Sequence, residues 1–149
     1  MGKLSRSILL ALTIICSNVG CAAEMQDLTG DQIKAAIYEI KQEPSDRRRF
    51  DLAQNLANSI RMDSRLGEVS EDAIVDVASL LRDPNDGVRT WAAAAVAQFG
   101  ARALPVVPEL EAALRRIEAE NKKLLVGPDF SSAVAIRGSL KKITGKTYE

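Results

Sequence analysis

Residues 80–89 (LLRDPNDGVR) and the alanine-rich residues 92–96 (AAAAV) decide the fold of this chain. The leucines close one helical segment, and Pro84 stops it because proline disfavours the helical conformation of the residue before it. Asp86 opens the next helix, and Gly100 stands where a left-handed residue commonly ends one. The stretch therefore predicts two antiparallel helices joined by a short turn.

The same junction occurs 40 residues earlier in the chain. Residues 43–49 (EPSDRRR) align with residues 83–89 (DPNDGVR), and the alignment matches an acid, the proline, an aspartate and the final arginine. A fainter third copy appears at a shift of 44, where residues 96–99 fall on residues 140–143. A period near 40 built from paired helices is typical of an α-solenoid, in which stacked pairs bury one another's apolar faces.

Helical periodicity continues over the rest of the chain, without the two-residue alternation of a strand. Thr29 and Gln32 have the spacing of a capping box, and a loop is expected around Gly127 and Pro128. The six predicted helices lie at about residues 30–43, 46–60, 71–83, 86–99, 105–121 and 131–144.

The repeated stretch resembles a HEAT repeat. The family pattern consists of leucines, an Asp-Pro turn, an aspartate, a Val-Arg pair and an alanine-rich second helix. The likeness is closest over residues 71–115, extends to residues 31–60, and is weakest over residues 104–145, where the turn lacks the Asp-x-x-Val-Arg string. The resemblance implies an all-α fold, a short α-solenoid of about three antiparallel helix pairs. It leaves the orientation of the last helix open.

The first 23 residues are predicted to be a secretory signal peptide. Lys3 and Arg6 occur there without any acid, and residues 8–16 then form an apolar run. That run is about half of the roughly 20 residues needed to cross a bilayer. Residues 24–149 would then form the HEAT-like helical domain of a periplasmic or secreted protein.

Two processing sites stay open. Residues 21–23 (CAA) suit cleavage before Glu24, whereas lipidation of Cys21 would anchor the chain to a membrane. The residues before Cys21 resemble the bacterial lipobox, except that Asn18 stands where leucine is usual, so we favour the soluble form. Removing residues 1–23 takes away two of the 20 basic residues and none of the 20 acidic ones, which leaves a net charge of −2.

Composition excludes several kinds of chemistry. The chain contains no histidine, and its two cysteines, Cys16 and Cys21, both precede Glu24. A disulfide framework, a Cys/His zinc site, a Ser-His-Asp triad and a Cys-His nucleophile are therefore excluded from the mature chain. The sequence shows no glycine-rich phosphate loop and no carboxylate pair with a partner that would shift a pKa. We expect a protein that is not an enzyme and has no cofactor.

The aspartates and arginines of the repeated turns have a structural interpretation. In HEAT repeats, residues at these positions form a ladder of charged hydrogen bonds between adjacent layers. The resemblance therefore implies an inter-repeat structural role for Asp46, Arg49, Asp83, Asp86 and Arg89.

The resemblance also implies binding of a protein or peptide through the concave face that the second helices would line. The balanced overall charge gives no sign of a nucleic-acid partner. Two alternatives are an inhibitor or immunity protein that neutralises a toxin or envelope enzyme, and an accessory subunit of a lyase-like enzyme. Trp91 is expected on the buried stripe of its helix, because it is three residues from Val88 and four from Ala95. The candidate partner contacts are Arg48, Asp51, Asn55, Thr90 and Gln98.

Overall fold

A computed structural model of the 149-residue chain describes residues 28–63, 66–124 and 132–148. The predicted signal peptide at residues 1–23, the candidate lipidation site Cys21, and the expected loop at Gly127 and Pro128 lie outside the described residues. No helix in the described ranges is long and apolar enough to cross a membrane.

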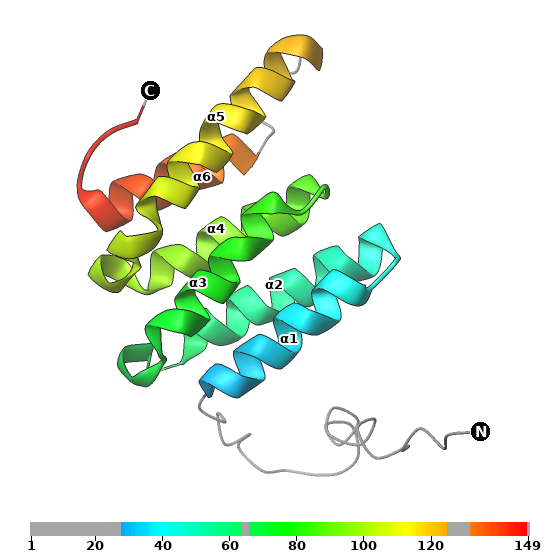
Figure 1. Cartoon of the computed structure of the whole chain (residues 1–149), viewed down its shortest axis with the longest axis vertical. Helices are drawn as coiled ribbons and strands as arrows, with labels where there is room; N and C mark the ends of the chain where they lie inside the picture. Colours follow the sequence, from blue (N-terminus) through cyan, green and yellow to red (C-terminus); the bar gives the residue numbers. More distant parts are fainter. Residues whose placement is uncertain (1–27, 64–65, 125–131, 149) are drawn as a thin grey trace.

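The described residues form helices and turns, without a strand, so the prediction of an all-helical fold with six helices is confirmed for them (Figure 1). The α-helices are α1 (Gly30–Gln42), α2 (Asp46–Met62), α3 (Glu71–Ser79), α4 (Asp86–Gln98), α5 (Val107–Leu124) and α6 (Ser132–Thr144). Three 3₁₀ segments connect them: η1 (Leu66–Glu68), η2 (Leu80–Arg82) and η3 (Gly100–Val106).

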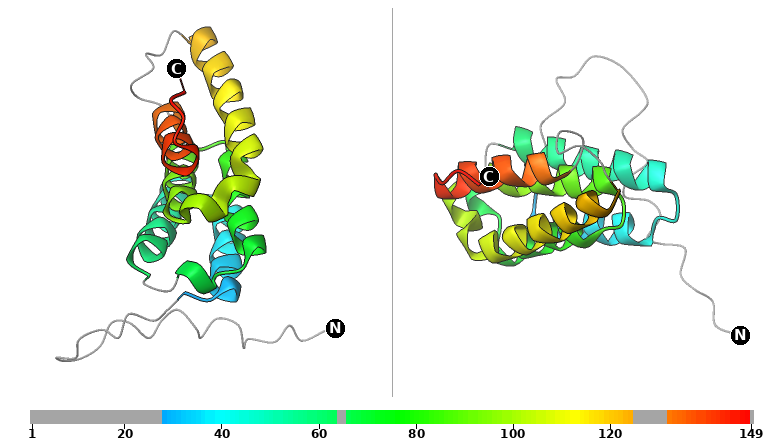
Figure 2. Two further views of the ribbon diagram at one scale, coloured as in Figure 1. Left: turned by 90° about the vertical axis from the view of Figure 1, so that its left-hand side faces the viewer. Right: turned by 90° about the horizontal axis from the view of Figure 1, so that it is seen from above.

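The helices form two layers. In Figure 2 (left), α2, α4 and α6 make one column and α1, α3 and α5 make the other. Helix α4 packs against both α2 and α6, and consecutive helices α1/α2, α3/α4 and α5/α6 pack across the two layers. Buried aliphatic side chains from both layers fill the space between them. The largest fully buried side chains of this core are Ile33, Ile40, Ile60, Ile74, Leu80, Leu81, Leu110, Ile117, Ile136 and Leu140.

The last helix runs parallel to α4. Near the start of both helices, Ser132 hydrogen-bonds Asp86. In their middle, the Ser139 hydroxyl donates to the carbonyl of Ala93 at 2.8 Å. These two contacts join residues 46 apart, and such a constant offset requires the same chain direction. The orientation that the sequence left open is thereby fixed.

Side-chain caps begin the first four helices. Thr29 and Gln32 form the predicted capping box: the Thr29 hydroxyl accepts from the Gln32 N–H at 3.3 Å, and the Gln32 side chain accepts from the Thr29 N–H at 2.8 Å. Ser45, Ser70 and Asn85 cap α2, α3 and α4 in the same general way, because their side-chain oxygens accept otherwise unpaired backbone N–H groups.

The predicted limits of two helices are wrong. The third α-helix ends at Ser79, and residues 80–82 continue it as a 3₁₀ turn. The fifth helix begins at Val107 rather than at Pro105, which lies inside η3, and it continues to Leu124 rather than ending at residue 121. Pro108 is the proline in the first turn of α5, a position where a missing N–H breaks no helical hydrogen bond.

The two glycines Gly100 and Gly138 make a matched pair for a stability test. Gly100 ends α4 with a φ of +55°, whereas Gly138 lies inside α6, where an added Cβ would meet nothing within 4 Å. Gly100→Ala should lower the free energy of unfolding by about 1 kcal/mol, because a side chain strains the left-handed conformation. Gly138→Ala should raise it by roughly 0.5–1 kcal/mol, because alanine is the better helix former. Urea unfolding of both variants measures the two values, and equal effects of the two substitutions would contradict this account.

Candidate functional site

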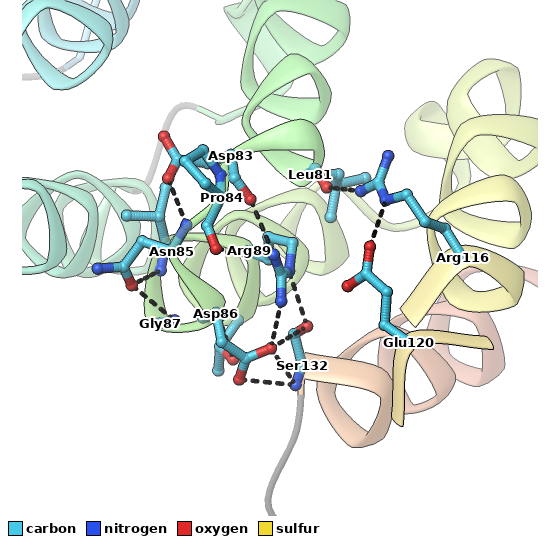
Figure 3. A network of polar contacts seen from close by, with 12 residues as sticks. Leu81, Asp83, Pro84, Asn85, Asp86, Gly87, Arg89, Arg116, Glu120 and Ser132 are labelled. Atoms are coloured by element: carbon cyan, nitrogen blue, oxygen red, sulfur yellow. Dashed lines mark hydrogen bonds and ion pairs between the residues drawn. The ribbon is translucent and has the colours of Figure 1, made fainter. Parts of the chain in front are cut away.

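The side chain of Arg89 is the centre of a polar network at the turn between α3 and α4 (Figure 3). Only 9% of Arg89 is exposed. One Nη donates to the carbonyls of Asp83 at 2.9 Å and Pro84 at 3.1 Å, and the other donates to the Asp86 carboxylate at 2.8 Å. Its Nε donates to the Ser132 hydroxyl at 3.2 Å. The guanidinium therefore joins the turn, the start of α4 and the start of α6.

The carboxylate of Asp86 caps helix α6 from outside that helix. It accepts from the backbone N–H of Ser132 at 3.1–3.2 Å and from the Ser132 hydroxyl at 2.7 Å. Burial by itself would raise the pKa of Asp86, but the Ser132 hydrogen bonds and the hydrogen bond and charge of Arg89 outweigh it and hold the pKa below its ordinary value. Asp86 is therefore held in its charged form.

A related set of contacts joins α2 to the same turn. Arg49 forms an ion pair with Asp46, and its Nη2 also lies 3.8 Å from the Asp83 carboxylate. The Asn85 side chain donates to the backbone carbonyl of Asp46 at 3.2 Å, while its oxygen accepts N–H groups at the start of α4. These contacts lie nearer to solvent, since the Asp46 side chain is 77% exposed. The structure thus brings Asp46, Arg49, Asp83, Asp86 and Arg89 into one network along the α2–α4–α6 turns.

Sequence reasoning missed several members of this framework. Ser132 was not predicted, although a serine at a helix start is a common capping signal, because its partner Asp86 lies 46 residues away. Arg102 was also missed: it donates to the carbonyls of Leu66 and Val69 and so ties η3 to the segment around η1. Arg116 donates to the carbonyl of Leu81 at 2.6 Å and joins α5 to η2.

The outward side of α4 is uncharged. We call Thr90, Trp91, Ala94 and Gln98 the α4 strip; all four are partly exposed, and residues 90–101 contain no charged residue. The expectation that Trp91 lies on the buried stripe is correct only in part. Trp91 packs against the core but stays partly exposed, because it lies at the edge of the stripe that faces α2.

Phe50 of α2 explains how Trp91 is held. The two rings meet edge to face, with centroids 6.3 Å apart and planes at 70°. Phe50 also lies over Gly87, where an added Cβ would come within 2.3 Å of the Phe50 ring. Glycine at residue 87 therefore makes the room in which Phe50 lies against α4 and contacts Trp91.

The candidate partner contacts divide between α2 and α4. On α2, Arg48 pairs with Glu43 at 3.3 Å and Asp51 pairs with Arg47 at 3.4 Å, while Asn55 is exposed. The two on α4 both contact their own helix. The Thr90 hydroxyl donates to the Asp86 carbonyl at 3.0 Å, and the Gln98 amide donates to the Ala94 carbonyl at 3.2 Å.

Two of the shallow depressions on the described residues lie on the α1–α3–α5 side. One, of about 320 Å³, lies between α1 and η2, and the other, of about 280 Å³, lies between η2 and α5. Both include Arg82, whose guanidinium is 2.7 Å from the Glu109 carboxylate. The described ranges hold no group of three or more side chains that could bind a metal ion.

Comparison with known proteins gave no match: no family model fits the chain, and no curated protein or solved structure is detectably similar to it.

Asp86 and Asp46 occupy equivalent places in the two repeats and allow a matched comparison. Asp86→Ala should lower the free energy of unfolding by about 2 kcal/mol, because it uncaps α6 and leaves the buried Arg89 without its carboxylate. Asp46→Ala should cost less than about 1 kcal/mol, because its ion pair is exposed. Denaturant unfolding of both variants tests this order, and a larger loss for Asp46→Ala would reverse it.

The lowered pKa of Asp86 also predicts a pH dependence. A carboxylate whose folded pKa is depressed contributes stability that is present above its unfolded pKa, of about 3.9, and is lost as the pH falls through the folded value. The difference in unfolding free energy between the wild type and Asp86→Asn should therefore be largest above about pH 5 and should shrink toward pH 2. Urea unfolding across this range measures it. A constant difference would show that Asp86 does not titrate as described.

Proposed function

We propose that this chain is a short α-solenoid of the HEAT type that is exported and holds a protein or peptide partner without transforming it. The 40-residue repeat of the turn supports the solenoid. So do the two layers of helices and the parallel course of α4 and α6. The basic start and apolar run of residues 1–16 support export to the periplasm or outside the cell.

The α4 strip carries the proposal. It is a partly exposed, uncharged surface on the middle helix of its layer, and it includes the single tryptophan of the chain. A charged side chain lies at its edge, since the Nζ of Lys142 on α6 donates to the Gln98 side-chain oxygen at 3.2 Å. An uncharged centre with a charged rim is the usual anatomy of a protein interface, and tryptophan is the residue most enriched among energetic hot spots.

The chemistry of the acids supports binding over catalysis. Asp86 has a perturbed pKa, which is a property shared with catalytic carboxylates. Its oxygens are occupied by Ser132 and Arg89, so its hydrogen-bonding capacity serves the fold. Glu43, Asp51, Glu109 and Glu118 are paired with arginines.

Affinity capture from an envelope extract tests this surface. Ala94→Gln adds a neutral side chain at the centre of the α4 strip, in a residue type that helices accept. We expect it to weaken capture of the partner about tenfold or more, because an interface tolerates added volume poorly. Quantitative mass spectrometry of proteins retained by the wild type and by the variant measures the change.

A double variant on α2 is the control for this experiment. Arg48→Glu with Asp51→Arg alters two charges that already pair with Glu43 and Arg47, outside the α4 strip. It should retain the same partner within about twofold, since exposed ion pairs contribute little. Capture that survives Ala94→Gln but is lost in the α2 variant would show that the partner binds to α2 instead. Turnover of a substrate by the purified protein would refute the non-enzymatic role.

A further inference from the structure

One lysine of α6 contacts the α4 strip. Lys141 and Lys142 occupy the last turn of α6, and neither forms an ion pair with a described residue. The Nζ of Lys142 donates to the Gln98 side-chain oxygen at 3.2 Å. One unpaired cation is therefore held at the end of the strip by a member of the strip itself.

Most arginines of the described ranges, in contrast, have a carboxylate partner. Seven of them have a carboxylate within 4.0 Å, supplied by their own helix or by a neighbour: Arg47, Arg48, Arg49, Arg82, Arg89, Arg116 and Arg137. On α6, Arg137 takes its carboxylate from Glu118 of α5, at 2.6 Å. The lysines whose side chains the structure describes have no carboxylate within 4.0 Å, and what distinguishes Lys142 among them is its contact with Gln98 of the α4 strip.

The sequence around the strip is free of acids over two elements. Residues 90–101 carry no charge, and residues 132–148 carry four basic residues and no acidic one. The nearest carboxylate at the start of α4, that of Asp86, is already bonded to Arg89 and Ser132. The α6 side of the strip is thus positive, on a chain whose mature form would have a net charge of −2.

We infer that the partner segment lying on the α4 strip is an acidic stretch of polypeptide, with carboxylates against Lys141 and Lys142. This inference rests on the proposed function. Complementary charges at the edge of an interface select the partner and accelerate the encounter. The uncharged strip offers Trp91 and Ala94 to apolar side chains of the same segment, a contact that a phosphate polymer would not use. Two lysines also neutralise too few phosphates to hold a nucleic acid.

Peptide selection tests the sign of the partner's charge without knowledge of its identity. A phage-displayed library of random 16-residue peptides is selected on the wild-type protein after depletion on the Ala94→Gln variant, so that only strip-dependent peptides are recovered. The recovered peptides should carry more Asp and Glu than the input library and a net negative charge. A recovered set with neutral or positive mean charge would overturn the inference and leave the proposed function standing.

Binding of a recovered acidic peptide then tests the two lysines. Trp91 is the only tryptophan of the chain, so its fluorescence reports on the strip directly. Lys141→Glu with Lys142→Glu should weaken the peptide at least tenfold, and the neutral pair Lys141→Gln with Lys142→Gln should weaken it less. Raising the salt from 50 to 500 mM should weaken the wild type more than either variant. The matched control, Lys34→Glu with Lys41→Glu on α1, should stay within twofold of the wild type.

The remaining outcomes separate the two proposals. If no peptide depends on Ala94, the α4 strip is not a polypeptide-binding surface, and the proposed function fails. If acidic peptides bind but the glutamate pair on α6 changes their affinity by less than twofold, only the role of the lysines fails. Vesicles of phosphatidylglycerol that alter Trp91 fluorescence in a lysine-dependent way, in the absence of any peptide binding, would assign the surface to a membrane and overturn the inference.

Discussion

A guanidinium that is nine-tenths buried must be neutralised and must have its N–H groups bonded, and Arg89 imposes this constraint on the whole fold. Its N–H groups donate hydrogen bonds to two turn carbonyls, the Asp86 carboxylate and the Ser132 hydroxyl. The turn before α4 and the start of α6 therefore cannot move independently. For that reason α6 lies parallel to α4, although the sequence before it lacks the Asp-x-x-Arg spacing that Asp46 and Arg49, and Asp86 and Arg89, share.

The location of this network determines what the rest of α4 can present. The charged residues of α4 are both in its first turn, where they bind the turn and α6. Beyond that turn the helix packs on both sides through small residues, because alanines at 92–95 let α2 and α6 approach closely. The outward side is left with Thr90, Trp91, Ala94 and Gln98, none of which is charged. A structural requirement at one end of the helix thus produces an uncharged surface along its length.

Local signals predicted much of this arrangement, and long-range contacts account for what they missed. The capping box at Thr29 and the positive φ at Gly100 follow from residues within a few positions, and both are confirmed. The 40-residue shift identified the aspartates and arginines of the turns, because each turn repeats the same short local pattern. Ser132 escaped because its role depends on a carboxylate 46 residues away. The start of α5 was misplaced because Pro105 and Pro108 both suit a first helical turn, and only packing chooses between them.

The helix dipole explains only part of the charge pattern around the two lysines of α6. A cation in the last turn of a helix is stabilised by the helix dipole, and this accounts for the presence of Lys141 and Lys142. It does not account for the absence of acids from residues 90–101 and 132–148, since the dipole is indifferent to a carboxylate one helix away. Arg137, on the same helix, has such a carboxylate in Glu118. The difference between Arg137, which faces α5, and Lys142, which contacts Gln98, follows the border of the α4 strip. The proposed acidic partner rests on that contact of Lys142 with the strip.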